Sequence, residues 1–343
     1  MRLLVGIGTM AVGLTLLSVA GETMTQEGEP AQTNPAPASP GGAFDPASLS
    51  PFTEGKPYLG RYETGLYGGG GNEMPKAHQE AGLRLAAGIQ PLDASGKADA
   101  ESGKIIALVL GHSNTHDYFS ALQEHFRRHA ARLRGGFELL DAAVGGQQLP
   151  EIRPLKGRVW DKAAALLDRP GYSPCQVQVL FLHTTYPGAH NQAKRPPGPF
   201  PETMQKMRQD LAAVLEHCAR IYPNLKLAYL TCDGLRHYTG FEPHVWQEAF
   251  AVKWLIEAQV KGEDWAAYEA REARDGKEAR PRRLPWLAWG PYIWDNTWDR
   301  GYFTDGVHPA AKAREIFVGK YAKFLLTDPV SKAWLARPGK PEE

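Results

Sequence analysis

Residues 105–115 read Ile-Ile-Ala-Leu-Val-Leu-Gly-His-Ser-Asn-Thr, and this stretch decides the fold that the sequence predicts. The apolar run over residues 105–110 ends at a glycine, which is typical of a strand buried on both faces of a sheet. A helical pattern over residues 115–133 follows, and Asn114 or Thr115 can cap that helix. The stretch therefore predicts a strand, a tight turn and a helix.

Ser113 lies in the turn between the predicted strand and the predicted helix. Backbone N–H groups without helical partners and the positive end of the helix dipole favour negative charge there, which suits an oxyanion on a substrate. Ser113 is therefore a candidate nucleophile. A serine after a strand is more often a helix N-cap, so this interpretation needs a base from elsewhere in the chain.

Strand-like and helical segments alternate on the C-terminal side of this stretch. Further strand-like segments cover residues 137–144, 176–182 and 225–231, and helical patterns cover residues 159–167, 201–222, 246–260 and 313–325. Such alternation predicts right-handed crossovers and a parallel sheet covered on both faces. We therefore predict an α/β fold: a three-layer α/β/α sandwich with a mostly parallel, doubly wound, flavodoxin-like sheet.

Length and composition limit the domain organisation and the partners. The chain has 343 residues, of which 43% are apolar, and can bury one substantial core. We predict a main domain at residues 104–328 with a charged insertion at 261–283, an N-terminal extension at 52–103 packed on it, and a tail at 329–343. Since 39 Lys and Arg face 38 Asp and Glu, we expect no nucleic-acid partner.

The N-terminal region has the pattern of an exported protein. Residues 1–20 combine an early arginine, an apolar stretch and small residues before Gly21, which is typical of a signal peptide. Residues 21–51 are rich in Pro, Ala and Gly and are expected to be a disordered linker. We therefore expect a secreted or periplasmic protein with no stable membrane span after signal cleavage.

An oxidising compartment raises the question of disulfides. The three cysteines, Cys175, Cys218 and Cys232, allow at most one internal bridge, and Cys218 with Cys232 is the first pair to test. Small buried thiols are an equally good reading of all three residues.

In open parallel sheets the functional site gathers at the carboxyl ends of the strands. Ser113 follows the first predicted strand, Gly145 the second and His183 the third, and the segment before the last helix reads Asp305-Gly306-Val307-His308-Pro309. An aspartate three residues before a histidine on one tight loop can hold the imidazole while its other nitrogen faces a nucleophile. The alternative is a turn in which Asp305 merely caps the following helix, but a serine at the strand–helix turn favours catalysis.

These segments together resemble the SGNH (GDSL-like) hydrolase superfamily, and within it the exported bacterial branch with a Gly-x-Ser-Asn first block. The resemblance covers residues 58–326, and its motifs are Gly111-His112-Ser113-Asn114-Thr115, Ala143-Val144-Gly145-Gly146-Gln147, Val177-Gln178-Val179, Pro223-Asn224-Leu225-Lys226-Leu227-Ala228-Tyr229, Trp289-Gly290-Pro291-Tyr292 and Asp305-Gly306-Val307-His308-Pro309. The resemblance implies a serine esterase in which Ser113 is the nucleophile, His308 the general base and then acid, and Asp305 the orienting carboxylate.

The resemblance also implies how the oxyanion is held: by the backbone N–H groups of Ser113 and Gly145 and by a third-block Asn side chain. Here the third block carries Tyr186 instead, in His183-Thr184-Thr185-Tyr186-Pro187. Tyr186, His183 or the nearby Asn191 could replace the missing donor. Gly145, Asn114, Tyr186 and His183 therefore form the predicted oxyanion and substrate-binding set.

Two histidine pairs have the i, i+4 spacing that can bind zinc on one helix face: His112 with His116, and His125 with His129. Neither pair carries the glutamate of His-Glu-x-x-His, so surface histidines are the better interpretation, and we expect no metal and no cofactor. The sequence thus predicts a secreted esterase acting on a small-molecule or carbohydrate ester, with an undetermined oligomeric state. The alternative is a weak or inactive carbohydrate-binding or surface protein on the same fold.

Overall fold

The structure is a computed structural model, and it describes residues 49–186, 198–232, 243–270, 282–294 and 298–337. All of these residues belong to one compact unit, Asn34–Glu343. The predicted signal peptide and residues 21–48 of the predicted linker lie outside the described residues. In the described part of the chain, no helix is both long and apolar enough to cross a membrane.

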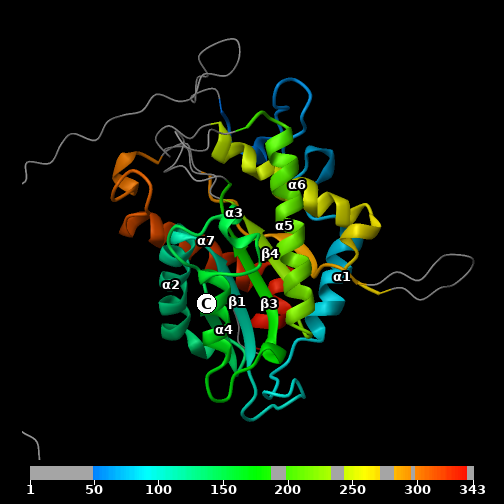
Figure 1. Ribbon diagram of the computed structural model, residues 1–343, viewed down its shortest axis with the longest axis vertical. Helices are drawn as coiled ribbons and strands as arrows, with labels where there is room; N and C mark the ends of the chain where they lie inside the picture. The colour runs from blue at the N-terminus through cyan, green and yellow to red at the C-terminus, as the bar shows by residue number, and fades with distance from the viewer. Residues whose placement is uncertain (1–48, 187–197, 233–242, 271–281, 295–297, 338–343) are drawn as a thin grey trace, which may run out of the picture. The chain divides into compact units, whose positions relative to one another are not determined.

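A parallel sheet of five strands forms the centre of the described residues (Figure 1). Its strands are β1 (Ile105–Gly111), β2 (Phe137–Asp141), β3 (Val177–His183), β4 (Leu227–Thr231) and β5 (Trp286–Trp289). They lie in the order β2-β1-β3-β4-β5, and every neighbouring pair is parallel. This is the flavodoxin-like doubly wound order, so the predicted fold class is confirmed.

Helices cover the sheet on both faces. The α-helices of the described residues are α1 (Lys76–Ala87), α2 (Ser113–Arg128), α3 (Leu149–Ile152), α4 (Arg158–Leu167), α5 (Glu202–Ile221), α6 (His244–Val260), α7 (Ala311–Thr327) and α8 (Pro329–Leu335). One core cluster joins the sheet to α1, α2, α7 and α8, and the other joins it to α3, α4, α5 and α6. These two clusters and the sheet are the three predicted layers.

The period of two along the strands explains why there are two cores. In β1, Ala107 and Val109 belong to the cluster on the α2 side, whereas Leu108 and Leu110 belong to the cluster on the α5 side. All seven residues of β1 are buried, as expected for a central strand covered on both faces. The apolar run at residues 105–110 thus fits the central position of β1, where both faces of the strand are covered.

Two elements differ from the predicted organisation at the C-terminal side. The Trp286–Trp289 segment, which we did not predict as a strand, is β5, and it is short and aromatic rather than β-branched. Residues 329–335, predicted to begin a tail, form α8 and bury Trp334 and Leu335 against the sheet. The domain therefore ends later than predicted, because these apolar side chains complete the core on the α7 side.

The N-terminal extension packs on α6 through aromatic and polar contacts. Phe52 is fully buried and its ring lies 4.8 Å from that of Phe250. Lys253 is almost fully buried, and its Nζ donates to the carbonyl oxygens of Thr64 at 2.9 Å and Tyr67 at 3.0 Å. Both contacts come from the middle of α6, so this helix supports residues 52–67.

Two further predictions concern the charged insertion and the cysteines. The described part of the insertion contains one short 3-10 turn, Asp264–Ala266, and residues 271–281 lie outside the described residues. Cys218 is a free thiol, so the suggested bridge to Cys232 is wrong. Its side chain belongs to the buried apolar stripe of α5, which burial and packing explain without a disulfide.

Candidate active site

The end of β1 and the start of α2 form the turn that holds Ser113. A side-chain carbon at Gly111 would lie 2.1 Å from the carbonyl oxygen of His183 and 2.2 Å from Thr115 Oγ1, so only glycine fits there. The N-cap of α2 is His112, not the predicted Asn114 or Thr115. Thr115 Oγ1 instead accepts from the His112 N–H at 3.1 Å and donates to the His183 carbonyl at 2.6 Å, which ties the turn to β3.

Ser113, His308 and Asp305 form a continuous hydrogen-bonded series. His308 Nδ1 lies 2.7 Å from Asp305 Oδ2, and His308 Nε2 lies 2.9 Å from Ser113 Oγ. A carboxylate only accepts hydrogen bonds, so Nδ1 carries the proton and Nε2 accepts from the serine hydroxyl. This is the arrangement of a serine nucleophile beside its general base.

Asp305 is held as an anion by its own loop. Its Oδ1 accepts from the backbone N–H groups of Val307 at 3.0 Å and His308 at 2.8 Å. Partial burial favours the neutral acid, but the hydrogen bonds from the backbone and ring of His308 and from Val307 outweigh it and lower the pKa of Asp305 to about 2. The side chain therefore stays ionised and keeps the His308 ring in one orientation.

Asn114 connects α2, which begins at Ser113, to the loop that carries His308. It is fully buried, and its Nδ2 donates to the carbonyl oxygen of Val307 at 3.4 Å. Asn114 was predicted to bind the oxyanion or the substrate, but the structure places its amide inside the protein on the loop of His308. Its position suits a residue that fixes the distance between Ser113 and His308.

Gly145 lies beside Ser113. A side-chain carbon at Gly145 would be 3.9 Å from Ser113 Cβ. The loop is anchored by Val144 N–H, which donates to the Gly111 carbonyl at 3.1 Å, and by Arg158 Nη1, which lies 3.4 Å from the Gly145 carbonyl. The backbone N–H groups of Ser113 and Gly145 have no hydrogen-bond acceptor among the described residues, so both are available to an oxyanion.

His183 and Tyr186, also predicted for the oxyanion or the substrate, are both buried side chains. His183 is fully buried, and its ring lies between those of Tyr118 at 5.8 Å and Phe317 at 6.2 Å. Tyr186 is 8% exposed, and burial together with the nearby carboxylate of Asp210 raises the pKa of its hydroxyl. Asn191 lies outside the described residues.

The segment after β3 is held by α6, which the sequence did not suggest. Glu248 is fully buried, and its Oε1 accepts from the Tyr186 N–H and the Thr185 hydroxyl, both at 2.6 Å. His244 Nε2 contacts the Tyr186 carbonyl, and burial lowers the pKa of His244 to about 4, so the ring is neutral and donates. A glutamate within the apolar pattern of α6 was the available signal for this contact.

The two histidine pairs were expected to be surface histidines, and His112 differs because it is buried. His112 is buried at the N-cap of α2, whereas His116 Nδ1 contacts Asp141 Oδ2 at the end of β2. The rings of His125 and His129 stack on each other with centroids 4.3 Å apart. In the residues that the structure describes, no group of three or more His, Cys, Asp or Glu could hold a metal ion.

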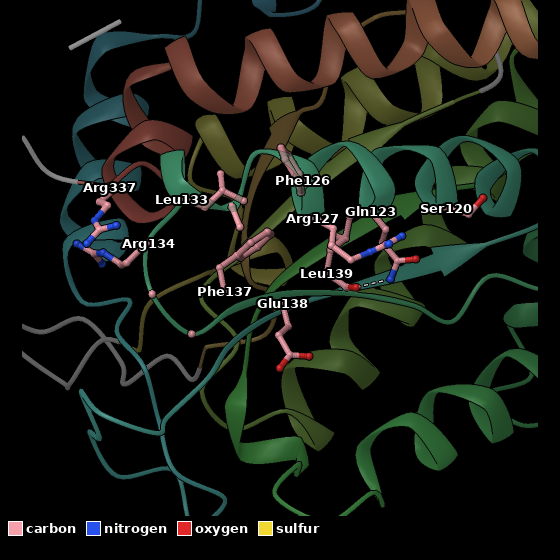
Figure 2. A pocket seen from close by; sticks show the side chains of 13 residues that line it. Ser120, Gln123, Phe126, Arg127, Leu133, Arg134, Phe137, Glu138, Leu139 and Arg337 are labelled. Atoms are coloured by element: carbon pink, nitrogen blue, oxygen red, sulfur yellow. Dashed lines mark hydrogen bonds between the residues drawn. The ribbon is translucent and has the colours of Figure 1, made fainter. Parts of the chain in front are cut away.

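A cavity of about 650 Å³ lies away from the triad, between α2 and the edge strand β2 (Figure 2). Figure 2 shows Phe126, Leu133 and Phe137 between Arg134 and Arg337 at one end and Arg127 with Gln123 at the other. Ser120 is the lining residue nearest to Ser113 on α2, and seven helical residues span about 10 Å. No triad residue lines this cavity, so it is not part of the candidate active site.

No protein-family model and no curated protein matches this sequence. Among solved structures, the chain is similar to TesA, with 14% identity and a TM-score of 0.37 over 66% of this chain and 99% of that one. A protein from Slackia heliotrinireducens described as a candidate SGNH hydrolase is 15% identical, with a TM-score of 0.34 over 64% of this chain and 98% of that one. The lipase Lip_vut3 from a goat rumen metagenome is 15% identical, with a TM-score of 0.34 over 63% of this chain and 95% of that one.

TM-scores of this size carry no functional assignment, so the fold rests on the molecule itself. The sheet order is doubly wound, the serine of the first block follows β1, and the Asp-x-x-His of the last block precedes α7. Ser113 and His308, 195 residues apart in sequence, meet at the carboxyl edge of that sheet. In its topology and in the position of these blocks, the chain has the α/β/α fold of SGNH-like hydrolases.

Proposed function

We propose that this protein is a serine ester hydrolase with Ser113 as nucleophile, His308 as general base and acid, and Asp305 as the orienting carboxylate. The observation that carries the proposal is the position of His308, whose two ring nitrogens contact Asp305 at 2.7 Å and Ser113 at 2.9 Å. Asp305 is ionised, with a pKa lowered to about 2 against the opposing effect of burial. The carboxylate can thus stabilise the imidazolium that forms during the reaction.

In the acylation half-reaction, Ser113 Oγ attacks the ester carbonyl carbon while its proton moves to His308 Nε2. The negative charge that develops on the carbonyl oxygen is met by the backbone N–H groups of Ser113 and Gly145 and by the positive end of α2. The bond to the alcohol oxygen then breaks, and His308 returns the proton to that oxygen. The alcohol leaves, and the acyl group remains on Ser113.

In the deacylation half-reaction, a water molecule attacks the acyl-enzyme. His308 Nε2 accepts the proton of the water, the same N–H groups hold the second oxyanion, and Ser113 recovers its proton as the carboxylic acid leaves. The two half-reactions need no metal and no cofactor to balance. His308 is neutral at the start of each half-reaction and cationic during it.

The proposed substrate is a small-molecule ester, and a carbohydrate ester is the finer proposal. The aromatic stretch at residues 285–298 gives this finer proposal no support, because its tryptophans are buried: Trp286, Trp289, Trp294 and Trp298. A sugar would therefore be held by polar groups near Ser113.

We also propose that residues 1–20 direct export. N-terminal sequencing of the mature protein tests this, and the expected first residue is Gly21.

One observation favours a second candidate, a weakly active or inactive binding protein. The third-block position has no Asn, and His183 and Tyr186, which could have replaced it, are both buried. Loss of one oxyanion donor costs about 10²–10³-fold in turnover in a known hydrolase. The two candidates therefore differ in rate rather than in the position of the nucleophile.

A fluorophosphonate probe separates the two candidates. Such probes phosphonylate a serine only when a neighbouring base activates it. We expect mass spectrometry to find the adduct on Ser113, no adduct on Ser113→Ala, and strongly slowed labelling of His308→Ala. Wild-type protein that is not labelled and hydrolyses no small acetyl ester would favour the binding protein and contradict the hydrolase.

A further inference from the structure

A second histidine–aspartate pair lies next to the nucleophile. His116 Nδ1 contacts Asp141 Oδ2, and Asp141 Oδ1 accepts from the Ala143 N–H at 2.8 Å. Asp141 is buried, and Lys162 Nζ lies 3.7 Å from its Oδ2. The His116 side chain is 53% exposed, so the aspartate fixes from inside a ring whose outer part faces solvent.

The positions of both residues follow from regular secondary structure. His116 stands three residues after Ser113 on the first turns of α2, a spacing that puts the two Cβ atoms about 5–6 Å apart. Side chains on a helix lean toward its N-terminus, which brings the ring toward the end that carries Ser113. Asp141 follows Leu139 with period two on the face of β2 that packs against α2.

The aspartate determines which hydrogen bond His116 can offer. A carboxylate only accepts, so Nδ1 carries a proton, and an imidazole that holds its single proton on Nδ1 offers Nε2 as an acceptor. Nε2 of His116 has no hydrogen-bond partner among the described residues, whereas Nε2 of His308 is occupied by Ser113 Oγ. His116 therefore presents an open acceptor beside the nucleophile.

The nearby cation does not change this role. Lys162 Nζ donates to the carbonyl oxygen of Ala143 at 2.8 Å, and its charge lies beside Asp141. A carboxylate or phosphate on the substrate would bring another acceptor to Nε2, so the neutral ring disfavours it. A hydroxyl group has the proton that Nε2 lacks, and hydroxyls are the common donors close to esters of polyols and sugars.

We propose that His116 Nε2 accepts a hydrogen bond from a hydroxyl group on the alcohol part of the substrate, carried by the second or third carbon from the ester oxygen. The substrate class is then monoesters of vicinal diols and other polyhydroxy alcohols, which include carbohydrates. The inference rests on the proposed hydrolase function and names the substrate of that same site. Asp141 is a positioning residue, since it acts only through His116.

Two isosteric esters test the proposal: 2-hydroxyethyl acetate and propyl acetate, which differ by a hydroxyl in place of a methyl group. The wild-type protein is expected to prefer the hydroxy ester in kcat/KM by about ten-fold, the size of one good hydrogen bond. His116→Phe is expected to bring this ratio close to one. His116→Gln keeps an acceptor oxygen and is expected to retain part of the preference.

Ser120→Ala is the matched control, because Ser120 lies one turn further along α2 and does not contact the triad. It is expected to keep both the activity and the ratio of the wild type. Asp141→Asn is expected to lower the ratio, since the side-chain amide can leave His116 in the other tautomer. A wild-type ratio of one, or a His116→Phe variant that keeps the preference, overturns the proposal.

A binding measurement decides the proposal even if no ester is hydrolysed. In Ser113→Ala, nitrogen-15 NMR is expected to show His116 protonated at Nδ1, and added 2-hydroxyethyl acetate is expected to shift its Nε2 resonance. Propyl acetate is expected to leave that resonance in place. No shift with the hydroxy ester contradicts the role of His116, whereas absent hydrolysis with a normal shift contradicts only the proposed hydrolase function.

Discussion

Two histidine–aspartate pairs lie near Ser113, and their difference shows how context assigns a role to the same two side chains. In both pairs a carboxylate accepts from Nδ1, which leaves Nε2 as the ring nitrogen that can meet another group. Nε2 of His308 meets the Ser113 hydroxyl at 2.9 Å, whereas the His116 side chain, on the first turns of α2, is 53% exposed. We propose that the first ring moves a proton and that the second accepts a hydrogen bond from the substrate.

The pairs also differ in how they are built. Asp305 and His308 belong to one loop, in which two backbone N–H groups hold the carboxylate. His116 and Asp141 come from different elements and meet only when α2 packs on β2. A pair within one loop can be recognised from spacing, while a pair between elements requires the fold.

The largest expected effect comes from removing the two histidines in turn. His308→Ala is expected to lower kcat/KM for an acetyl ester by about 10⁴-fold or more, because Ser113 then lacks its base. His116→Ala is expected to cost about ten-fold or less on a hydroxy ester, the value of one hydrogen bond. Steady-state kinetics on both variants compares the pairs directly, and equal losses would contradict the division of roles.

Substitution of the two aspartates is expected to reduce activity in the same order as substitution of the two histidines, with a smaller difference between the two variants. Asp305→Asn is expected to lower kcat by about 10³–10⁴-fold, since the imidazolium loses its counter-charge and the ring its fixed tautomer. Asp141→Asn is expected to change the preference between hydroxylated and plain esters much more than it changes kcat. A loss of kcat in Asp141→Asn as large as in Asp305→Asn would make Asp141 part of the proton-transfer machinery.

Asn114→Ala is expected to have an intermediate effect, because it removes the contact between α2 and the Val307 carbonyl. A buried polar partner left unpaired costs about 1–3 kcal/mol, which urea unfolding measures as a lower free energy of unfolding. The looser loop is expected to lower kcat more than it raises KM. Unchanged kcat in a destabilised Asn114→Ala protein would restrict Asn114 to a role in stability.

The smallest expected effect is the pH dependence of stability that Asp305 contributes. A lowered carboxyl pKa stabilises the folded protein above the unfolded value of about 3.9, and this contribution is lost as the pH falls toward about 2. The difference in unfolding midpoint between wild type and Asp305→Asn is therefore expected to be constant above about pH 5 and to shrink between about pH 4 and 2. A difference that grows on acidification would contradict the ionised carboxylate.

Local features of this molecule could be predicted from the sequence. The buried run of β1, the turn at Ser113 and the spacing of Asp305 and His308 each depend on a few consecutive residues. The parallel order of the sheet follows from the alternation of strands and helices. Each helix links two parallel strands by a right-handed crossover, and such crossovers build a doubly wound sheet. These features depend little on which side chains happen to become neighbours.

The features that the sequence misjudged depend on packing between distant elements. His183 is two residues after Phe181 and four after Val179, so all three side chains lie on the same face of β3. That face packs in the core on the α2 side. Residues at strand ends therefore face the active site or the core according to the pleat, which a search of strand ends alone ignores. Glu248 and Asp141 contact the site from other elements, and no local pattern connects them to it.

The separation of 195 residues between Ser113 and His308 affects when the protein can become active. The ribosome completes the nucleophile early, but the base and its aspartate belong to the last sixth of the chain. A nascent or truncated chain that ends before residue 308 contains the serine and the oxyanion N–H groups without a proton acceptor. Activity is therefore expected to appear only when the final helices dock, so an incomplete chain is expected to be inactive.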